Sequence, residues 1–338
     1  MSRRYVVIGA GGVGAALAAG LAEAGIPVVL VSRGRTYDAI REHGLRFTHE
    51  GRTRVLDVPV EGSPEGVALR PDDVLLLAVK SQDAPAALSE WAQRPVAGGI
   101  AGTALPVVTL QNGLDAERVA LRHFDTVVSG TTLIAAQHVV PGEVTVRNGP
   151  KLGQIILGAF PTAELAADAA ALVPGVADDL RRAQWLIHEA EDPRRWKAWK
   201  TLAASTFPVE VLAGTPEELD ELRGRVRDEA RRVFAAAGYG FADPSELSYD
   251  PAQARLPQAQ DGPLGLSTWQ SFARGSGSET DYLTGEIVLQ ARLLGIPAPA
   301  SAAVRRTLAE AAAAGEKPGV RPARDILRAL PDAVGAPA

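Results

Sequence analysis

The chain of 338 residues contains no cysteine, and this absence excludes disulfide bonds and thiol catalysis. Its five histidines show no metal-ligand spacing, so no metal centre is predicted. No apolar run is long enough to span a bilayer, and the first residues lack the charged-then-apolar layout of a signal peptide. We therefore expect a cytoplasmic protein without a membrane partner.

Positive charge is not concentrated in any block of the sequence. The chain has 35 Lys and Arg against 40 Asp and Glu, which gives a net charge of −5 and an isoelectric point of about 5.7. A surface that follows nucleic-acid phosphates needs clustered cations, so no nucleic-acid partner is predicted. Hydrophobic residues make up 46% of the chain, which is enough for two domains with their own cores.

The first clear motif is Gly9-x-Gly11-x-x-Gly14, between the apolar run YVVI and an Ala- and Leu-rich stretch of helical periodicity. In a dinucleotide-binding turn these glycines permit the tight turn, the approach of the backbone to the diphosphate, and close packing of helix on strand. An ordinary glycine-rich turn is the alternative, but the strand before and the helix after favour a dinucleotide site. The predicted cofactor-binding residues of this turn are Gly9, Gly11, Gly12, Val13 and Gly14.

A second strand, PVVLVSR, ends at Ser32 and Arg33, and this end indicates which dinucleotide binds. Sites for NAD place Asp or Glu here to bind the ribose 2′-hydroxyl, whereas a guanidinium suits the 2′-phosphate of NADPH. Here the carboxylate is missing and Arg33 takes its place. A solvated arginine at a strand end is the alternative, and the charge argument favours NADPH.

Further buried strands are predicted at residues 72–83, 107–115 and 154–160. The first of these strands ends in Lys80 at its carboxyl end, where open α/β sheets bind ligands. The second ends at Asn112, within Gln-Asn-Gly, although Asn-Gly alone is only a turn signal. The alternation of strands and helices predicts an α/β fold with a doubly wound parallel sheet and an antiparallel addition. A hairpin-like pair is expected around Pro141-Gly142.

The second half of the chain is predicted to be helical. Residues 217–239, 278–295 and 301–315 carry apolar side chains at helical spacing, and the second of these begins with Ser and ends with Gly. Residues 241–266 are rich in Pro, Gly, Gln and Asp and read as a connection that shapes or covers a cleft. The expected division is a nucleotide-binding domain at 1–190, a helical domain at 191–332 and a flexible tail at 333–338.

The stretch RWKAWKTLAASTF places Lys200 where charged residues give way to apolar ones. A lysine among apolar neighbours loses solvation, which favours its neutral form and makes it a useful acid near neutral pH. The alternative is a lysine whose stem packs while its ammonium stays in water.

Several segments occur in the order seen in ketopantoate reductases: VIGAGGVG, SRG, DVLLLAVKSQD, TLQNG, GTTLIAA, RWKAWKTL and STWQSFARGSGSETDYLTGEIV. The chain resembles that family from about residue 4 to residue 310. The resemblance implies a Rossmann-like domain followed by an all-helical domain, and reduction of 2-dehydropantoate to pantoate by NADPH. The glycine motif is shared by many dehydrogenases, whereas QNG followed by ETDYLTGEIV is much more specific.

The resemblance also implies roles for individual residues. Lys200 falls on the catalytic lysine that protonates the substrate carbonyl, and Glu279 falls on the glutamate of the active-site charge balance. Ser267 falls on a serine that holds the substrate carboxylate, and Asn112 and Lys80 fall on residues beside the nicotinamide and substrate. Each has a structural alternative: a first-turn helix acid for Glu279, an N-cap for Ser267, turn chemistry for Asn112 and a surface charge for Lys80.

The chain departs from the family after the lysine. Asparagines one and two helical turns on are replaced by Ala204 and by Phe207 or Pro208, and Thr284 stands where the family often has Asn. These changes remove hydrogen bonds to the substrate, which changes specificity more than reaction type. A relative that reduces another 2-oxo acid, ketone or imine is therefore the main alternative. A non-catalytic NADPH-binding regulator would need neither Lys200 nor Glu279, and a homodimer is as compatible with the sequence as a monomer.

Overall fold

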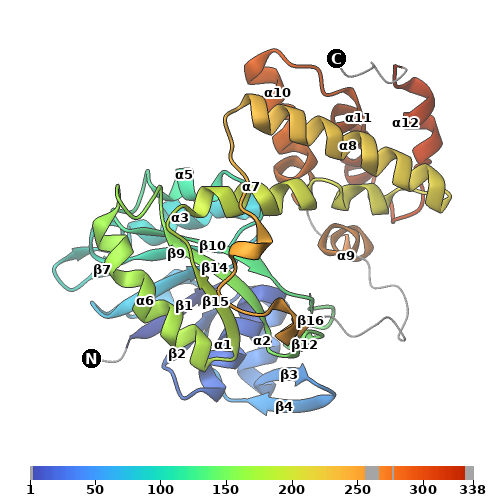
Figure 1. The fold of residues 1–338 in the computed structure, drawn as a ribbon. Helices are drawn as coiled ribbons and strands as arrows, with labels where there is room; N and C mark the ends of the chain where they lie inside the picture. The colour runs from blue at the N-terminus through green and yellow to red at the C-terminus, as the bar shows by residue number, and fades with distance from the viewer. Residues whose placement is uncertain (1–2, 256–265, 276–277, 332–338) are drawn as a thin grey trace. The chain divides into compact units, whose positions relative to one another are not determined.

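The computed structural model describes residues 3–255, 266–275 and 278–331 (Figure 1). The chain divides into two compact units. The sheet unit comprises Met1–Lys197 and Ala242–Gln260, and the helical unit comprises Ala198–Phe241 and Asp261–Ala338. The boundary after Lys197 falls inside helix α7 (Pro193–Ala204).

The sheet unit is built on an eight-stranded sheet. All neighbouring strands pair in parallel except β10 and β14, which run antiparallel. This confirms the predicted doubly wound sheet with an antiparallel addition. In sheet order the strands are β15 (Trp185–Glu189), β14 (Gly153–Ala159), β10 (Val127–Leu133), β9 (Val107–Thr109), β6 (Asp73–Leu77), β1 (Arg4–Ile8), β2 (Val28–Val31) and β5 (Val60–Glu61).

Helices cover both faces of this sheet, which is why β1 and β6 are buried along their whole length. One core joins α1 and α6 to one face and includes Leu17, Val176 and Trp185. A second core lies under α3 on the other face and includes Leu88 and Trp91. The helices of the unit are α1 (Gly12–Glu23), α2 (Gly34–His43), η1 (Pro64–Gly66), η2 (Ser81–Asp83), α3 (Ala84–Ala92), α4 (Ala101–Ala104), α5 (Ala116–Ala120) and α6 (Ala167–Arg182).

A four-stranded sheet adds to the sheet unit in the order β11 (Ala136–Gln137), β12 (Glu143–Val146), β3 (Leu45–His49) and β4 (Arg52–Leu56). Strands β11 and β12 pair antiparallel, as expected for the hairpin around Pro141-Gly142. A short hairpin joins β7 (Pro95–Val96) to β8 (Gly99–Ile100).

The segment that begins at Ala242 returns to the sheet unit, so the division differs from the expected single boundary at residue 191. It carries η4 (Pro244–Glu246), η5 (Pro251–Gln253) and β16 (Ala254–Arg255), and β16 pairs with β13 (Gly149–Pro150). The Asn148 side chain donates to the Ala254 carbonyl over 2.6 Å, and Arg195 pairs with Glu246 over 2.8 Å. Residues 256–265 of the expected connection and the expected tail at 333–338 lie outside the described residues.

The helical unit packs its helices around one core that includes Val209, Leu222, Val226, Phe272 and Val304. Its elements after α7 are η3 (Phe207–Val211), α8 (Pro216–Ala236), α9 (Ser267–Arg274), η6 (Glu279–Tyr282), α10 (Thr284–Leu294), α11 (Pro299–Ala313) and α12 (Ala323–Ala329). Among the described helices none is both long and apolar enough to cross a membrane.

The helix predicted at residues 278–295 is in fact two elements, η6 and α10, with a break at Leu283. The backbone of Leu283 leaves the helical region, and the Thr284 hydroxyl donates to the Ser205 carbonyl over 2.6 Å. Gly295 ends α10 in the left-handed conformation, as the Gly stop predicts. Pro208 likewise marks a break, because α7 ends at Ala204 before η3 begins.

Candidate active site

The glycine turn joins β1 to α1 with close backbone contacts. Gly9 has φ +106°, and a Cβ on it would lie 2.9 Å from the Val79 amide nitrogen. A Cβ on Gly14 would collide with the Gly9 carbonyl oxygen, whereas one on Gly11 would meet no atom within 4 Å. Glycine is therefore needed at the turn and at the helix contact, and the backbone at Gly11 is open to a ligand.

The N-terminus of α1 fits a diphosphate. Gly11 is its N-cap, no side chain caps it, and its first turn holds no acidic residue. The first N–H groups of a helix carry partial positive charge and need acceptors, which phosphate oxygens supply. Gly12 lies close to β11, where its Cβ would be 3.1 Å from the Ala136 side chain.

The end of β2 presents Arg33 to solvent, while Ser32 is buried with its N–H donating to the Glu61 carbonyl over 3.0 Å. Arg33 is also the N-cap of α2. This placement suits a cation that meets the 2′-phosphate of a dinucleotide. Glu61, on the neighbouring strand β5, was not predicted to lie near this end. Its carboxylate lies against η1, because a Cβ on Gly66 would collide with Oε2.

Lys80 and Asn112 follow neighbouring strands, β6 and β9, at the same carboxyl edge of the sheet. The turns that carry them are tied together. The Ser81 hydroxyl donates to the Asn112 carbonyl over 2.9 Å. The Gln111 amide donates to the carbonyls of Leu77 and Val79 over 2.7 and 2.9 Å. The structure thus brings these two predicted residues to the edge where the glycine turn lies.

Lys200, Glu279 and Ser267 belong to the helical unit. The ammonium of Lys200 lies 5.3 Å from the centre of the Phe207 ring, which is a favourable cation–π geometry. Burial lowers the pKa of Lys200 to about 8, and the negative charge of Glu279 opposes that shift. Glu279 is 8% exposed and is the first residue of η6. This combination of a desolvated lysine and a nearby carboxylate is typical of a tuned acid.

Ser267 is exposed and is the first residue of α9, whose N-cap is Leu266 rather than the serine. The N–H groups of Leu266 and Trp269 donate to the carboxylate of Glu210 in η3. Burial raises the pKa of Glu210 to about 7 despite these bonds, and in the described part of the chain its Oε1 is buried without a hydrogen-bond partner. Sequence reasoning missed Glu210, although an acid inside the apolar run FPVEVL was the available signal.

The altered family positions are apolar or already bonded. Ala204 is fully buried, and Phe207 contacts Lys200. The Thr284 hydroxyl donates its hydrogen bond to the Ser205 carbonyl. Trp196 lies in the sheet unit at 2% exposure and packs edge-on against His188, so it is a core residue.

Sequence reasoning also missed a second lysine of α7, Lys197. It is 3% exposed, pairs with Glu117 over 2.8 Å and donates to the Gln111 carbonyl over 2.6 Å. The signal was a second lysine one helical turn before Lys200, placed between Trp196 and Ala198.

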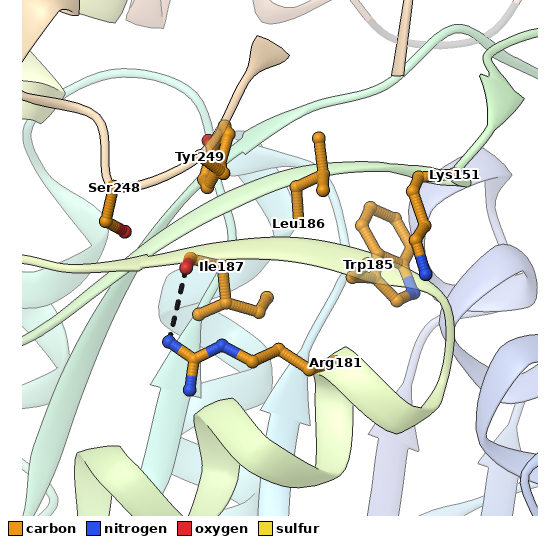
Figure 2. A pocket seen from close by; sticks show the side chains of 7 residues that line it. All are labelled: Lys151, Arg181, Trp185, Leu186, Ile187, Ser248 and Tyr249. Atoms are coloured by element: carbon orange, nitrogen blue, oxygen red, sulfur yellow. Dashed lines mark hydrogen bonds between the residues drawn. The ribbon is translucent and has the colours of Figure 1, made fainter. Parts of the chain in front are cut away.

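Figure 2 shows a pocket of about 400 Å³ that belongs to the sheet unit and contains none of the predicted site residues. Arg181 extends from α6 below β15, where it donates to the Ile187 carbonyl over 3.3 Å and pairs with Glu189 over 2.7 Å. Lys151 donates to Gln184 over 3.0 Å. Both cations of the pocket, Lys151 and Arg181, are therefore bonded to other residues of the protein. The lining residues are Lys151, Arg181, Trp185, Leu186, Ile187, Ser248 and Tyr249.

Among the described residues, no three His, Cys, Asp or Glu side chains are grouped so that they could hold a metal ion. The glycine turn, the open helix N-terminus and the strand ends beside it define a dinucleotide-binding protein. Lys200 has a lowered pKa beside a carboxylate, and a lysine of this kind can give up a proton near neutral pH.

Comparison with known proteins gives the family. The model described as ketopantoate reductase PanE/ApbA matches residues 5–162, and its C-terminal counterpart matches residues 199–312. The chain belongs to the ketopantoate reductase family, whose members are oxidoreductases that act on a carbonyl and use a nicotinamide cofactor. The resemblance stated from the sequence is thereby confirmed.

Individual relatives span nearly the whole chain. The 2-dehydropantoate 2-reductase of Archaeoglobus fulgidus is 28% identical over 314 residues, which are 90% of this chain and 95% of that protein. The PanE/ApbA family ketopantoate reductase of Ralstonia eutropha JMP134 has a TM-score of 0.71 at 24% identity, over 92% of this chain and 99% of that one. A D-mandelate dehydrogenase, solved with NADH and anilino(oxo)acetate, has a TM-score of 0.72 at 18% identity over the same shares. The two structural likenesses establish the fold.

Proposed function

We propose that this protein reduces 2-dehydropantoate to pantoate with NADPH. The observation that carries the proposal is Lys200, an acid whose pKa is lowered to about 8 by burial and supported by the charge of Glu279. A protein that only binds a dinucleotide has no use for such a pair. Family membership and the glycine turn supply the rest of the argument.

In this proposal the Lys200 ammonium donates a proton to the carbonyl oxygen of the substrate. A reduced nicotinamide held by the residues of the glycine turn would supply the hydride that the carbonyl carbon needs. The ammonium also stabilises the negative charge that develops on the oxygen, because a cation held in a partly desolvated site needs no reorganisation. A pKa near 8 keeps Lys200 mostly protonated at neutral pH, while making its proton easier to give than that of a solvated lysine.

The remaining predicted residues receive roles that follow the family. Glu279 keeps Lys200 charged, since it raises the pKa that burial lowers. Asn112 and Lys80, at the carboxyl edge of the sheet, contact the nicotinamide end of the cofactor and the substrate. Ser267 binds a polar group of the substrate from the start of α9. The N–H groups at the start of α1 bind the diphosphate.

The choice of NADPH rests on Arg33, which is exposed at the end of β2. Replacement Arg33→Ala is expected to weaken NADPH binding by about tenfold or more and NADH binding by much less, because only NADPH carries the 2′-phosphate. Titration of each cofactor by nicotinamide fluorescence measures this. Arg52→Ala, an exposed arginine on β4, is the matched control. Equal weakening of both cofactors would contradict the phosphate-binding role.

Steady-state oxidation of NADPH by purified protein with 2-dehydropantoate tests the activity itself. NADH in place of NADPH, and a panel of other 2-oxo acids, serve as comparisons. Turnover of 2-dehydropantoate well above the panel supports the proposal. Tight NADPH binding with negligible turnover of 2-dehydropantoate would contradict it and favour the second candidate.

The second candidate is reduction of a carbonyl compound that lacks the carboxylate of a 2-oxo acid. Glu210 favours it, because its carboxylate takes the N–H groups of Leu266 and Trp269 beside Ser267, where the family binds a substrate carboxylate. A substrate carboxylate at this helix N-terminus would repel the ionised form of Glu210, which prevails above pH 7 because the pKa of Glu210 is raised to about 7. Ala204 and the occupied hydroxyl of Thr284 also provide no hydrogen bond for a substrate hydroxyl.

A matched pair of substrates separates the two candidates. Each 2-oxo acid is compared with its neutral ester, in the wild type and in Glu210→Gln. The second candidate predicts that the wild type prefers the ester at pH 8, where Glu210 is mostly ionised because its pKa is about 7. At this pH Glu210→Gln should raise kcat/KM for the acid by about tenfold and leave the ester unchanged. Preference for the acid in both proteins contradicts it.

A homodimer stays a prediction. On α10 the side chains of Leu289, Leu293 and Leu294 are 43%, 71% and 42% exposed, and such a face favours self-association. Light scattering across a range of protein concentrations measures the mass directly.

A further inference from the structure

A buried ion pair lies beneath the turn that carries Asn112. Lys197 and Glu117 are 3% and 1% exposed, and their charged atoms are 2.8 Å apart. Lys197 also donates to the Gln111 carbonyl over 2.6 Å. All three residues belong to the sheet unit. A lysine buried this deeply is uncommon, and its two short contacts account for its charge.

The carboxylate of this pair is itself fixed from two strands. Its Oε1 accepts from the Thr109 hydroxyl over 2.7 Å and from the Ser129 hydroxyl over 3.1 Å, in addition to the ammonium. Thr109 ends β9 and Ser129 lies in β10. Both hydroxyls are buried, so a shift of Glu117 would remove the acceptor of the Ser129 hydroxyl and leave the Thr109 hydroxyl only the Val128 carbonyl at 3.4 Å. The fixed carboxylate of Glu117 therefore fixes the position of the Lys197 ammonium.

A second set of hydrogen bonds also holds the turn. The Gln111 side chain reaches the carbonyls of Leu77 and Val79, and the Ser81 hydroxyl reaches the Asn112 carbonyl. The backbone carbonyls of Gln111 and Asn112 thus each receive a side-chain donor. Without Lys197, the Gln111 carbonyl would lose the hydrogen bond that it receives from a buried ammonium.

Stability alone is a poor reason for such a pair. Burying two charges costs several kcal/mol per ion by desolvation, and apolar replacement of a buried pair is often neutral or stabilising. What an apolar pair cannot supply is a charged donor directed at the Gln111 carbonyl. The contribution particular to Lys197 is therefore the geometry of residues 111–113.

We propose that Lys197 is a positioning residue: through the Gln111 carbonyl it fixes the turn that presents Asn112 at the carboxyl edge of the sheet, where the cofactor and substrate are bound. The inference rests on the proposed function for the role of Asn112. It assigns Lys197 no contact with cofactor or substrate. Its effect on catalysis passes through the placement of Asn112.

The test separates positioning from stability by removing one charge or both. In Lys197→Met, Glu117 is left as an uncompensated buried charge, so both stability and geometry suffer. In the double variant Lys197→Met with Glu117→Gln no buried charge remains, and the Gln amide oxygen still accepts from Thr109 and Ser129. Lys151→Met, in which the replaced lysine bonds Gln184 at the surface, is the control. Melting temperature, NADPH affinity, kcat and KM are measured for each.

The double variant is expected to regain most of the melting temperature of the wild type while kcat/KM stays about tenfold or more below it, since small displacements of positioning groups cost that much. Hydrogen exchange of the peptide containing residues 107–116 should be faster than in the wild type in both variants. If the double variant regains wild-type kcat/KM and exchange along with its stability, Lys197 is only a structural anchor and the inference is wrong.

If the proposed function itself is wrong, these experiments give a different result. In that case the wild type itself turns over no 2-oxo acid or ester. Hydrogen exchange at residues 107–116 and NADPH affinity then still decide the role of Lys197, because neither needs turnover.

Discussion

Two lysines one helical turn apart on α7 have opposite surroundings. Lys197, in the sheet unit, is buried with a carboxylate at 2.8 Å and a carbonyl at 2.6 Å. Lys200, in the helical unit, faces the ring of Phe207, and burial lowers its pKa to about 8 against the charge of Glu279. The first arrangement holds a cation in place as an anchor. The second makes the cation a better acid, which suits proton transfer.

The comparison teaches that burial alone does not identify a functional lysine. A short, well-bonded partner compensates the desolvation of Lys197. At Lys200 the compensation from Glu279 is smaller than the desolvation, because the net pKa shift is downward. The incomplete compensation, rather than the depth of burial, marks the residue suited to give up a proton.

The largest expected effect follows from removing the acid. Lys200→Ala should lower kcat by about 10²- to 10⁴-fold, the usual contribution of a positioned general acid, while NADPH affinity changes little. Single-turnover kinetics with a fluorescence titration of NADPH measure both. Survival of near-wild-type turnover in Lys200→Ala would remove the basis for treating the two lysines differently.

For the free energy of unfolding, replacement of Lys197 should have a larger effect than replacement of Lys200. Lys197→Met should cost about 3–5 kcal/mol, because it leaves Glu117 buried without its partner. Lys200→Met should cost less than about 1 kcal/mol, since it removes an ammonium whose burial is already unfavourable. Urea unfolding of the two variants, followed by tryptophan fluorescence, compares them. Equal losses would mean that the two surroundings differ less than the contacts indicate.

The smallest effect concerns the tuning of Lys200. Glu279 raises the pKa of Lys200, so Glu279→Gln should lower that pKa further. The alkaline limb of the pH profile for carbonyl reduction should then move down by roughly one pH unit. An unchanged or upward-shifted limb would show that Glu279 does not act on Lys200 by its charge. Glu246→Gln, whose carboxylate pairs with Arg195 in the sheet unit, is the control.

Local patterns predicted much of this molecule. The glycine spacing located the β1–α1 turn, and buried runs located the strands β1, β2, β6, β9 and β14. Helical periodicity located α8, α10 and α11. Each of these signals depends on near neighbours in sequence. The pairing of β16 with β13 was not predictable, since two-residue strands leave no periodic signal. The partner of Lys197 was missed for a similar reason: Glu117 is distant in sequence, and only the fold brings it near.

The site was predicted less completely than the fold. Lys80 and Asn112 were expected at a ligand-binding edge, and the rule for carboxyl ends of parallel strands places them there. Glu210 was missed because its effect depends on the start of α9, a segment distant in sequence, although its place in an apolar run hinted at burial. The pKa of a buried group depends on desolvation by the folded chain and on charged partners that are distant in sequence, and the sequence alone reports neither.

The pH profile of kcat/KM for carbonyl reduction tests the central claim most directly, because it reports the ionisation of the acid in the free enzyme. The pKa of Lys200 is lowered to about 8, and the protonated form is the donor. The rate should therefore be level near neutral pH and fall as pH rises through about 8. A profile that stays level well above pH 8, or that falls identically in Lys200→Ala, would contradict the assignment of Lys200 as the acid.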